Sequence, residues 1–335
     1  MRENGYMRTK ATLLLFAFLA AHAVPPPLAA AEQAAEKVTA KEVKIQLNWL
    51  PEPEFGGIYA SELRGAFAAH GLAVEILKGG PDVPAVQMAA AGRVEFAVAA
   101  ADEVIALREK GADIVALYAT YQTSPQAIMV WRSRPVTGIK ALLDAGGTLI
   151  AQPGLAYLKW LGSRFDMSKT RIVPYGSGAM AQFLDPKATD VAMQCFLPAE
   201  PVTARRLGVE TKIFLLANTG FNPYTAVVIT RRDFFTAHRE VCRGLVAALR
   251  EGWKAYLDDP KPANEAMAKL NTSMDLGAFA EAAEAQRDLL ESSDTRQLGL
   301  GAMNEKRWAQ LSQQLVDLGI IDVPVPAQDC FVTLD

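Results

Sequence analysis

Short apolar strands alternate with amphipathic helices along most of the chain after Lys41. The strand pattern is predicted over residues 43–49, 73–77, 94–99, 113–118, 127–132, 147–151, 171–174, 190–195, 211–216 and 225–230. Helical periodicity is predicted between them over residues 57–69, 83–91, 102–110, 138–144, 154–165, 178–184 and 199–207. Glycines stand where several of these helices should end, namely Gly71, Gly92, Gly111 and Gly208. The alternation predicts an α/β fold whose parallel sheets carry helices on both faces.

The last hundred residues have a different pattern. From Asp233 onward the sequence is almost purely helical, and it predicts one long helix through Trp253 to Leu257 that ends before Pro260. Two or three further helices are expected after it. A helical tail that follows two α/β halves suggests that it packs back against one of them.

A weak internal repeat supports two such halves. The helix over 83–91 and the strand that follows it lead to Asp102 and Glu103 at the start of another helix. The helix over 178–184 and its following strand lead in the same way to Glu200. Two similar units that end in acids fit two lobes facing each other across a cleft. The strand segments 126–132 and 224–231 lie where the units meet, and they could act either as hinges or as ordinary core strands.

The beginning of the chain has the features of an export signal. Arg8 and Lys10 precede an apolar run over residues 11–23, and the small residues 29–31 follow it. The run is shorter than the roughly 20 residues of a membrane span. We therefore expect a signal peptide over residues 1–31 and a mature protein outside the cytoplasm, without a membrane anchor.

Charge and cysteine content exclude several classes of function. The formal net charge of the chain is −3, and loss of the predicted signal peptide, which carries a net charge of +2, would make it −5. No basic stripe suggests binding to nucleic acid or to an anionic membrane. The three cysteines, Cys195, Cys242 and Cys330, lack metal-site spacing, so no zinc site is expected. They are expected to be buried thiols, although one disulfide is possible.

The most informative segment is residues 47–59, at the end of the first predicted strand. Asn48 offers an amide and Trp49 a flat indole for stacking on a planar ring. Glu52 and Glu54 sit in a proline-bounded turn and could bind an amine or an amidine-like edge through charge-assisted hydrogen bonds. Tyr59 follows on the next helix. The alternative is a turn-capping amide, a core indole and a solvated acidic turn.

Further candidates lie at the ends of later strands. In the first half, Asp102 and Glu103 open a helix, where N-capping alone could explain one acid. In the second half, Gly154 enters a helix whose first turn has free N–H groups that could bind an anion. The remaining candidate ligand-binding residues are Tyr121, Gln122, Ser124, Tyr157, Tyr175, Gln194, Phe196, Glu200 and Tyr224.

The motif from Leu47 to Tyr59 resembles the opening motif of ABC-transporter substrate-binding proteins of the taurine/sulfonate and thiamin-pyrimidine-precursor branch. Residues 101–104, 121–126 and 194–201 fit the same family. The resemblance implies a type II periplasmic-binding-protein fold with two α/β lobes, two crossovers and a helical tail. It implies one lobe from residues 41–127 with 226–335 and another from residues 128–225. It further implies a periplasmic protein, a small-molecule ligand caught between the lobes, and a permease partner.

The ligand and the absence of catalysis are inferred from the side chains. Aromatic, acidic and amide groups favour a neutral or cationic heterocycle, whereas a sulfonate or taurine would call for arginines or more hydroxyls. The thiamin-pyrimidine relatives often carry histidine where this chain has Phe55. A pyrimidine-synthase-like enzyme would need a cofactor lysine and a histidine near the cleft, but the mature chain has only His70 and His238. We expect a binding protein with no catalytic residue, metal or cofactor; the enzyme and a sulfonate binder are the alternatives.

Overall fold

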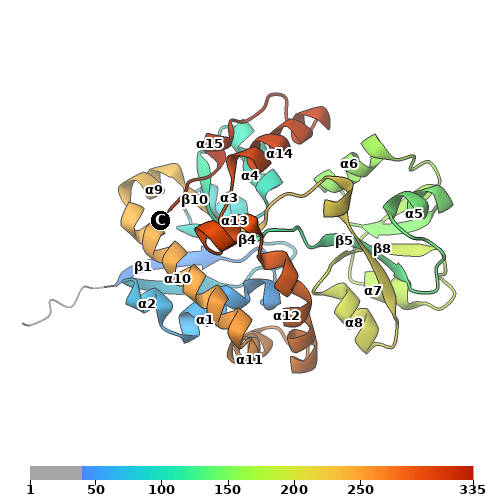
Figure 1. Cartoon of the computed structure of the whole chain (residues 1–335), viewed down its shortest axis with the longest axis horizontal. Coiled ribbons are helices and arrows are strands. Elements are labelled where there is room, and N and C mark those ends of the chain that lie inside the picture. The colour runs from blue at the N-terminus through green and yellow to red at the C-terminus, as the bar shows by residue number, and fades with distance from the viewer. Residues whose placement is uncertain (1–39, 335) are drawn as a thin grey trace, which may run out of the picture. The chain divides into compact units, whose positions relative to one another are not determined.

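The computed structural model describes residues 40–334, and their ten strands form two five-stranded sheets (Figure 1). The predicted signal peptide, residues 1–31, lies outside the described residues. The first sheet has the strand order β2-β1-β3-β10-β4. Its strands are β1 (Lys41–Gln46), β2 (Leu72–Leu77), β3 (Phe96–Ala99), β4 (Ile114–Tyr121) and β10 (Thr225–Arg231).

The second sheet, green to yellow in Figure 1, repeats this plan with the order β7-β6-β8-β5-β9. Its strands are β5 (Gln126–Trp131), β6 (Gly147–Ala151), β7 (Thr170–Pro174), β8 (Val191–Phe196) and β9 (Thr211–Leu215). All ten predicted strands are confirmed within a few residues. The repeat seen in the sequence corresponds to equivalent positions, because β3 and β8 both stand third in the order of their sheets.

The sequence pattern predicts parallel sheets, but each sheet also contains one antiparallel strand. β10 is antiparallel to β3 and β4 in the first sheet, and β5 is antiparallel to β8 and β9 in the second. Each of these strands enters its sheet from the other half of the molecule, so it runs against its neighbours. The chain passes between the sheets twice, through residues 122–125 and through residues 216–224.

Helices connect the strands in both halves. Those of the first half are α1 (Gly56–Leu63), α2 (Ala66–Ala69), α3 (Ala85–Ala90) and α4 (Ala101–Glu109). Those of the second half are α5 (Ile139–Ala145), α6 (Ala156–Arg164), α7 (Ala179–Leu184) and α8 (Glu200–Arg206). The single helix predicted over 57–69 is wrong, because Gly65 has a left-handed φ of 69° and separates α1 from α2.

The C-terminal tail also has more breaks than its pattern indicated. The long predicted helix begins as α9 (Arg232–Ala237), is interrupted at His238, and continues as α10 (Arg239–Asp258). Five helices follow instead of two or three: α11 (Lys261–Leu270), α12 (Leu276–Leu290), α13 (Ser293–Leu298), α14 (Glu305–Asp317) and α15 (Ala327–Cys330).

The two glycines that open α1 allow this helix to pack closely on α10. A Cβ atom at Gly56 would lie 2.3 Å from the Tyr256 ring, and one at Gly57 would lie 2.2 Å from the Trp253 ring. Ser61 strengthens the contact, since its hydroxyl donates to the α10 carbonyl of Ala248 at 2.8 Å. The glycine pair therefore fixes the start of α1, and with it the preceding acidic turn, against the tail.

Within residues 40–334, the three cysteines are free, buried thiols. No helix among these residues combines the length and the apolar character that crossing a membrane requires.

Candidate functional site

Three glutamates from the two halves of the fold influence one another electrostatically. Glu52 lies in the loop after β1, and Glu54 lies in the following 3-10 helix η1 (Pro53–Phe55). Glu200 is the first residue of α8, directly after β8. The charge of Glu200 acts on both Glu52 and Glu54. The three residues, here named the carboxyl triad, come after the carboxyl ends of parallel strands, where α/β sheets place their ligands.

Burial is the main reason why Glu52 holds its proton. It raises the pKa of Glu52 to about 8, and the charge of Glu200 adds to this effect. Hydrogen bonds from Trp49 and Asn271 oppose the shift. Asn271 donates to the Pro51 carbonyl at 3.1 Å and reaches a Glu52 carboxylate oxygen at 3.5 Å. The amide thus holds the turn in place from the end of α11.

Glu54 is the most secluded of the three. Its side chain is 9% exposed, and no hydrogen bond to its carboxyl group is formed within residues 40–334. Burial, followed by the charges of Glu52 and Glu200, raises the pKa of Glu54 well above its ordinary value. A buried carboxyl group without a donor or a cation is expensive to ionise, so this environment favours the neutral form of Glu54.

Glu200 has the opposite environment, because both of its carboxylate oxygens accept hydrogen bonds. The Tyr175 hydroxyl donates to Oε1 at 3.0 Å, and the Phe196 N–H donates to Oε2 at 2.8 Å. Burial raises the pKa of Glu200, whereas these two hydrogen bonds and that of its own backbone N–H lower it. Of the triad, Glu200 is the carboxyl group best able to remain ionised.

Aromatic side chains adjoin the triad from both halves. The rings of Tyr121 and Phe196 meet edge to face with centroids 6.5 Å apart, and both Glu54 and Glu52 act electrostatically on Tyr121. The Tyr121 hydroxyl donates to Gln286 on α12 at 2.5 Å, and the Gln286 amide donates to the Pro53 carbonyl at 2.8 Å. The structure thus brings together seven predicted residues: Trp49, Glu52, Glu54, Tyr121, Tyr175, Phe196 and Glu200.

A second group of predicted residues surrounds Gln194 on β8. Its side-chain oxygen accepts from the Gln152 N–H at 2.7 Å and from the Tyr157 hydroxyl at 2.9 Å. These bonds orient the amide, and its NH₂ group has no partner among the described residues. Gly154 lies in the adjoining turn with a φ of 84°, and nothing approaches within 4 Å of the position that its Cβ would take. Gln194 therefore offers a fixed donor pair.

The remaining acids stand at the start of α4. Glu103 accepts from the Ala100 N–H at 2.8 Å and so closes the first turn of the helix. Burial raises the pKa of Asp102, although backbone N–H groups oppose the shift. The Tyr224 carbonyl accepts from the Ala101 N–H at 3.0 Å. Asp102 and Glu103 form a separate acidic position. Neither is among the groups that shift the pKa values of the triad.

Several other predicted residues are buried in the fold or hydrogen-bonded to it. Tyr59 is 3% exposed in the core of the first half. Gln122 is saturated, because it donates to the Ala119 and Ala302 carbonyls and accepts from the Ser292 hydroxyl.

Ser124 and Tyr224 belong to the connections between the sheets. The Ser124 N–H donates to the Asn222 side chain at 2.8 Å. The Tyr224 ring is covered by the guanidinium group of Arg307. Asn48 is half-buried, and its side-chain oxygen is buried without a partner among the described residues.

Two residues near the triad were not expected from the sequence. Asn271 and Gln286 come from the helical tail, and they lie 220 and 233 residues from their partners in the turn, Pro51 and Pro53. An isolated amide at the end of one helix and another on the buried face of the next have no sequence pattern that marks a site. Only the expectation that the tail packs back on a lobe pointed toward them.

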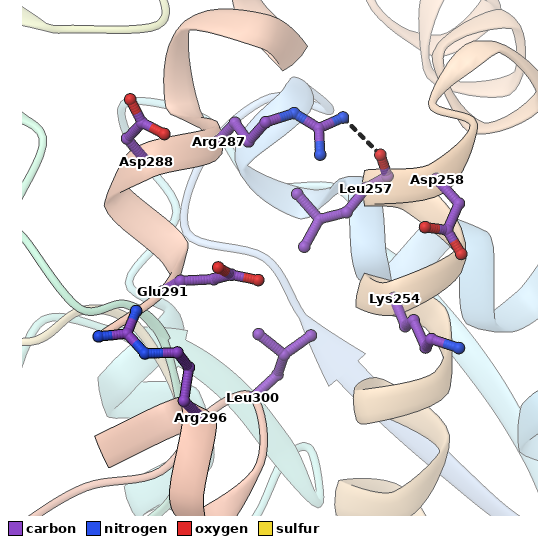
Figure 2. A pocket seen from close by; sticks show the side chains of 8 residues that line it. All are labelled: Lys254, Leu257, Asp258, Arg287, Asp288, Glu291, Arg296 and Leu300. Carbon is purple, nitrogen blue, oxygen red and sulfur yellow. Dashed lines mark hydrogen bonds between the residues drawn. The ribbon is translucent and has the colours of Figure 1, made fainter. Parts of the chain in front are cut away.

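A hollow of about 430 Å³ lies elsewhere, between α10, α12 and α13 (Figure 2). Exposed side chains of both charge signs line it, including Lys254, Asp258 and Arg296. Figure 2 shows Arg287 bonded to the Leu257 carbonyl across one side of this hollow. Its residues are well separated in sequence from the strand ends that carry the triad.

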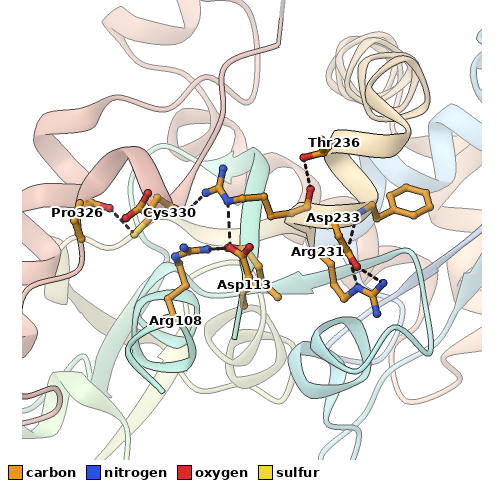
Figure 3. A network of polar contacts seen from close by, with 11 residues as sticks. Arg108, Asp113, Arg231, Asp233, Thr236, Pro326 and Cys330 are labelled. Atoms are coloured by element: carbon orange, nitrogen blue, oxygen red, sulfur yellow. Dashed lines mark hydrogen bonds and ion pairs between the residues drawn. The ribbon is translucent and has the colours of Figure 1, made fainter. Parts of the chain in front are cut away.

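A polar network fastens the end of the chain to the first sheet (Figure 3). Asp113 accepts from Arg108 at 2.9 Å and from Arg232 at 3.1 Å. Arg232 also donates to the Asp329 carbonyl at 2.7 Å. Within the described part of the chain, no group of three or more His, Cys, Asp or Glu side chains could hold a metal ion.

The two sheets of matching strand order, with polar groups at the ends of their strands, define a periplasmic-binding-protein fold. A family model described as NMT1/THI5 like matches residues 52–263. That range is well over half of the chain, so the chain belongs to the NMT1/THI5 like family. The fold and the family resemblance predicted from the sequence are both confirmed.

Similar proteins are named for binding small molecules. The chain is 25% identical over 345 residues to the riboflavin-binding protein RibY of Chloroflexus aurantiacus, covering 95% of this chain and 94% of that protein. It is 21% identical to the formylaminopyrimidine-binding protein of Halalkalibacterium halodurans, covering 87% and 90%. The periplasmic aliphatic sulphonate binding protein SsuA from Escherichia coli superimposes with a TM-score of 0.69 at 12% identity, covering 88% and 92%. This last likeness shows the fold alone.

Proposed function

We propose that this protein is the extracytoplasmic solute-binding component of an ABC importer and captures a small planar heterocycle between two lobes. The lobes comprise residues 41–127 with 226–335 and residues 128–225. The ligand passes to a membrane permease, and the predicted signal peptide directs export. The carboxyl triad carries this proposal, because a cluster of acids without a cation among aromatic rings suits donor groups on a flat ring and repels anions.

The names of two relatives support a heterocyclic ligand, since riboflavin and formylaminopyrimidine both contain a pyrimidine-type ring with N–H donors. A sulfonate is disfavoured despite the likeness to SsuA. No lysine or arginine is among the groups that act on the triad. A sulfonate held there would meet carboxyl groups instead of the cations that anion sites use.

In this proposal the protein is not an enzyme. His70 lies at the surface, where its ring nitrogen is 2.8 Å from Glu251. His238 lies between α9 and α10, with its ring against Phe234. Neither histidine stands beside a member of the triad, so the site offers no imidazole for general acid–base catalysis.

The test is a ligand panel on the protein purified from its exported fraction, by calorimetry and thermal shift. The panel contains riboflavin, 4-amino-2-methylpyrimidine, taurine and ethanesulfonate. We expect one of the two heterocycles to bind, and at a concentration one hundred times its Kd to stabilise the protein by about 2.7 kcal/mol. Trp49→Ala should weaken that binding while the folded far-UV spectrum is kept. Binding of the sulfonates alone would contradict the proposal.

A further inference from the structure

The three carboxyl groups of the triad differ in the number of donors that they receive. Glu200 accepts from the Tyr175 hydroxyl and from the Phe196 N–H. Glu52 is bonded by Trp49 and Asn271. Glu54 receives none within residues 40–334, although its side chain is more than nine-tenths buried. Hydrogen-bond donors therefore stabilise a negative charge on Glu200, whereas none among the described residues stabilises a charge on Glu54.

The charged neighbours of Glu54 favour the neutral form further. Glu52 from the same loop and Glu200 from α8 both act on it, and no cation offsets them. The Tyr121 hydroxyl from β4 faces the same region, and its bond to Gln286 leaves it no proton for Glu54. Tyr256 from α10 donates to Asn264 at 2.7 Å. Within residues 40–334, the charges that act on Glu54 are thus those of acids, and the Tyr121 hydroxyl already donates elsewhere.

We propose that Glu54 is a neutral hydrogen-bond donor to the ligand, that Glu200 is the ionised acceptor, and that together they select a ring edge carrying an acceptor beside a donor. This inference rests on the proposed function. Two like groups in unlike environments take opposite roles, as paired carboxyl groups do in acid–base sites. The high pKa of Glu54, caused by burial and its acidic neighbours, supports the neutral form.

This division defines a chemical class of ligand. A 4-aminopyrimidine carries a ring nitrogen acceptor next to an amino donor. The flavin ring carries an imide N–H next to a carbonyl. Both edges can meet one carboxylic acid and one carboxylate, whereas an ionised sulfonate or phosphate offers only acceptors, gives Glu200 no donor and brings a second negative charge close to it. The triad therefore discriminates by hydrogen-bond pattern, which rejects mismatched ligands more strongly than shape alone does.

Variants of Glu54 test the proposal, with riboflavin and 4-amino-2-methylpyrimidine as probes. Glu54→Gln retains a donor, so we expect its Kd at neutral pH to stay within about threefold of wild type. Glu54→Met keeps the volume and loses the donor, so we expect binding weaker by about tenfold or more. Wild-type affinity should fall at alkaline pH as Glu54 ionises. The affinity of Glu54→Gln should fall less over the same pH range, because glutamine does not ionise. Glu62→Gln, at an exposed glutamate on α1, is the matched control.

Two outcomes would overturn the proposal. If Glu54→Gln binds as weakly as Glu54→Met, Glu54 acts as an ionised acceptor. Infrared difference spectra of wild type against Glu54→Gln give a second, ligand-free measure. We expect the carbonyl stretch of a protonated carboxylic acid in wild type at neutral pH, and its absence would refute the neutral form. If neither probe binds wild type while this band is present, the proposed heterocycle function fails and the protonation of Glu54 stands.

Discussion

One guanidinium nitrogen of Arg206 on α8 bonds both carboxylate oxygens of Asp275, at 2.8 and 2.7 Å. Asp275 also caps α12 by accepting from the Ala278 N–H at 3.0 Å. Arg206 donates to Glu281 at 2.9 Å, and Arg205 bonds the same carboxylate. These ion pairs join the helix that carries Glu200 to the tail helix that carries Gln286. They form a charged contact between the second half and the tail.

We expect Arg206→Gln to favour a more open molecule. Exposed ion pairs contribute little free energy because solvent screens them, so the change should shift an opening equilibrium by only a few-fold and leave folding intact. Small-angle scattering of the free protein should show a larger radius of gyration for the variant. Added salt should expand wild type and have less effect on the variant, because salt screens the same pairs.

The matched control for the loss of the Arg206 ion pairs is Arg243→Gln. Arg243 pairs with Glu240 on the same helix, at 3.1 Å, so this pair connects no separate elements. Its scattering should equal that of wild type. Identical scattering curves for Arg206→Gln and wild type at low salt would show that the ion pairs do not hold the two halves together.

Arg307 on α14 fastens both connections between the sheets. It donates to the Asn222 carbonyl at 2.8 Å and to the Pro223 carbonyl at 3.0 Å in one connection, and to the Gln122 carbonyl in the other. Its guanidinium carbon lies 3.8 Å from the centroid of the Tyr224 ring. We expect Arg307→Met to lower the free energy of unfolding by at least about 2 kcal/mol, because it leaves part-buried carbonyl acceptors without a donor.

Urea denaturation measures this loss, and Lys306→Met is the control. Lys306 is the adjacent, exposed cation on the same helix, so its replacement should change stability by less than about 0.5 kcal/mol. An equal effect of the two substitutions would mean that the bonds of Arg307 to the connections add nothing to stability.

Local patterns predicted the strands well, because each apolar run is short and bounded by turn residues. The breaks in the helices escaped detection for a physical reason. The apolar positions keep their spacing through Gly65 and through His238, so periodicity alone cannot mark a change of direction there. The antiparallel strands β5 and β10 depend on which half of the molecule the chain comes from, and no local pattern records that.

The candidate site was predictable where chemistry stands at a strand end. Glu52, Glu54 and Glu200 all follow parallel strands, and the structure brings them together. Sequence could not separate their environments, because the donors that distinguish Glu200 from Glu54 come from Tyr175 and from the backbone. The sequence predicts Gln122 as a ligand residue, but it could not reveal that Ala302 and Ser292, 180 and 170 residues away, complete the hydrogen bonds of this amide.

Gly57 is a point of close packing between α1 and α10. Gly57→Ala would place a methyl group 2.2 Å from the Trp253 ring, and the ring is fully buried. We expect a loss of about 1–3 kcal/mol in the free energy of unfolding, because a packed core does not yield to an added methyl group. Gly162→Ala is the control, since the nearest atom there is the Met167 sulfur at 3.9 Å. That change should stabilise the protein by about 0.5–1 kcal/mol.

The carboxyl triad should make the free protein less stable as the pH rises. Burial raises the pKa of Glu52 from 4.5 to about 8, so the folded state holds this proton more tightly than the unfolded state does. The stability contributed by the bound proton is therefore fully present below about pH 4.5 and is lost as the pH rises to about 8. Glu54 and Glu200 act in the same direction.

We therefore expect Glu52→Gln to reduce the fall in stability across this window without abolishing it, because the other two carboxyl groups remain. Urea denaturation at a series of pH values, without ligand, measures the slope for each protein. Glu75→Gln, at an exposed glutamate on β2, should keep the wild-type slope. A slope for Glu52→Gln as steep as that of Glu75→Gln would show that Glu52 ionises as readily in the folded protein as in the unfolded chain.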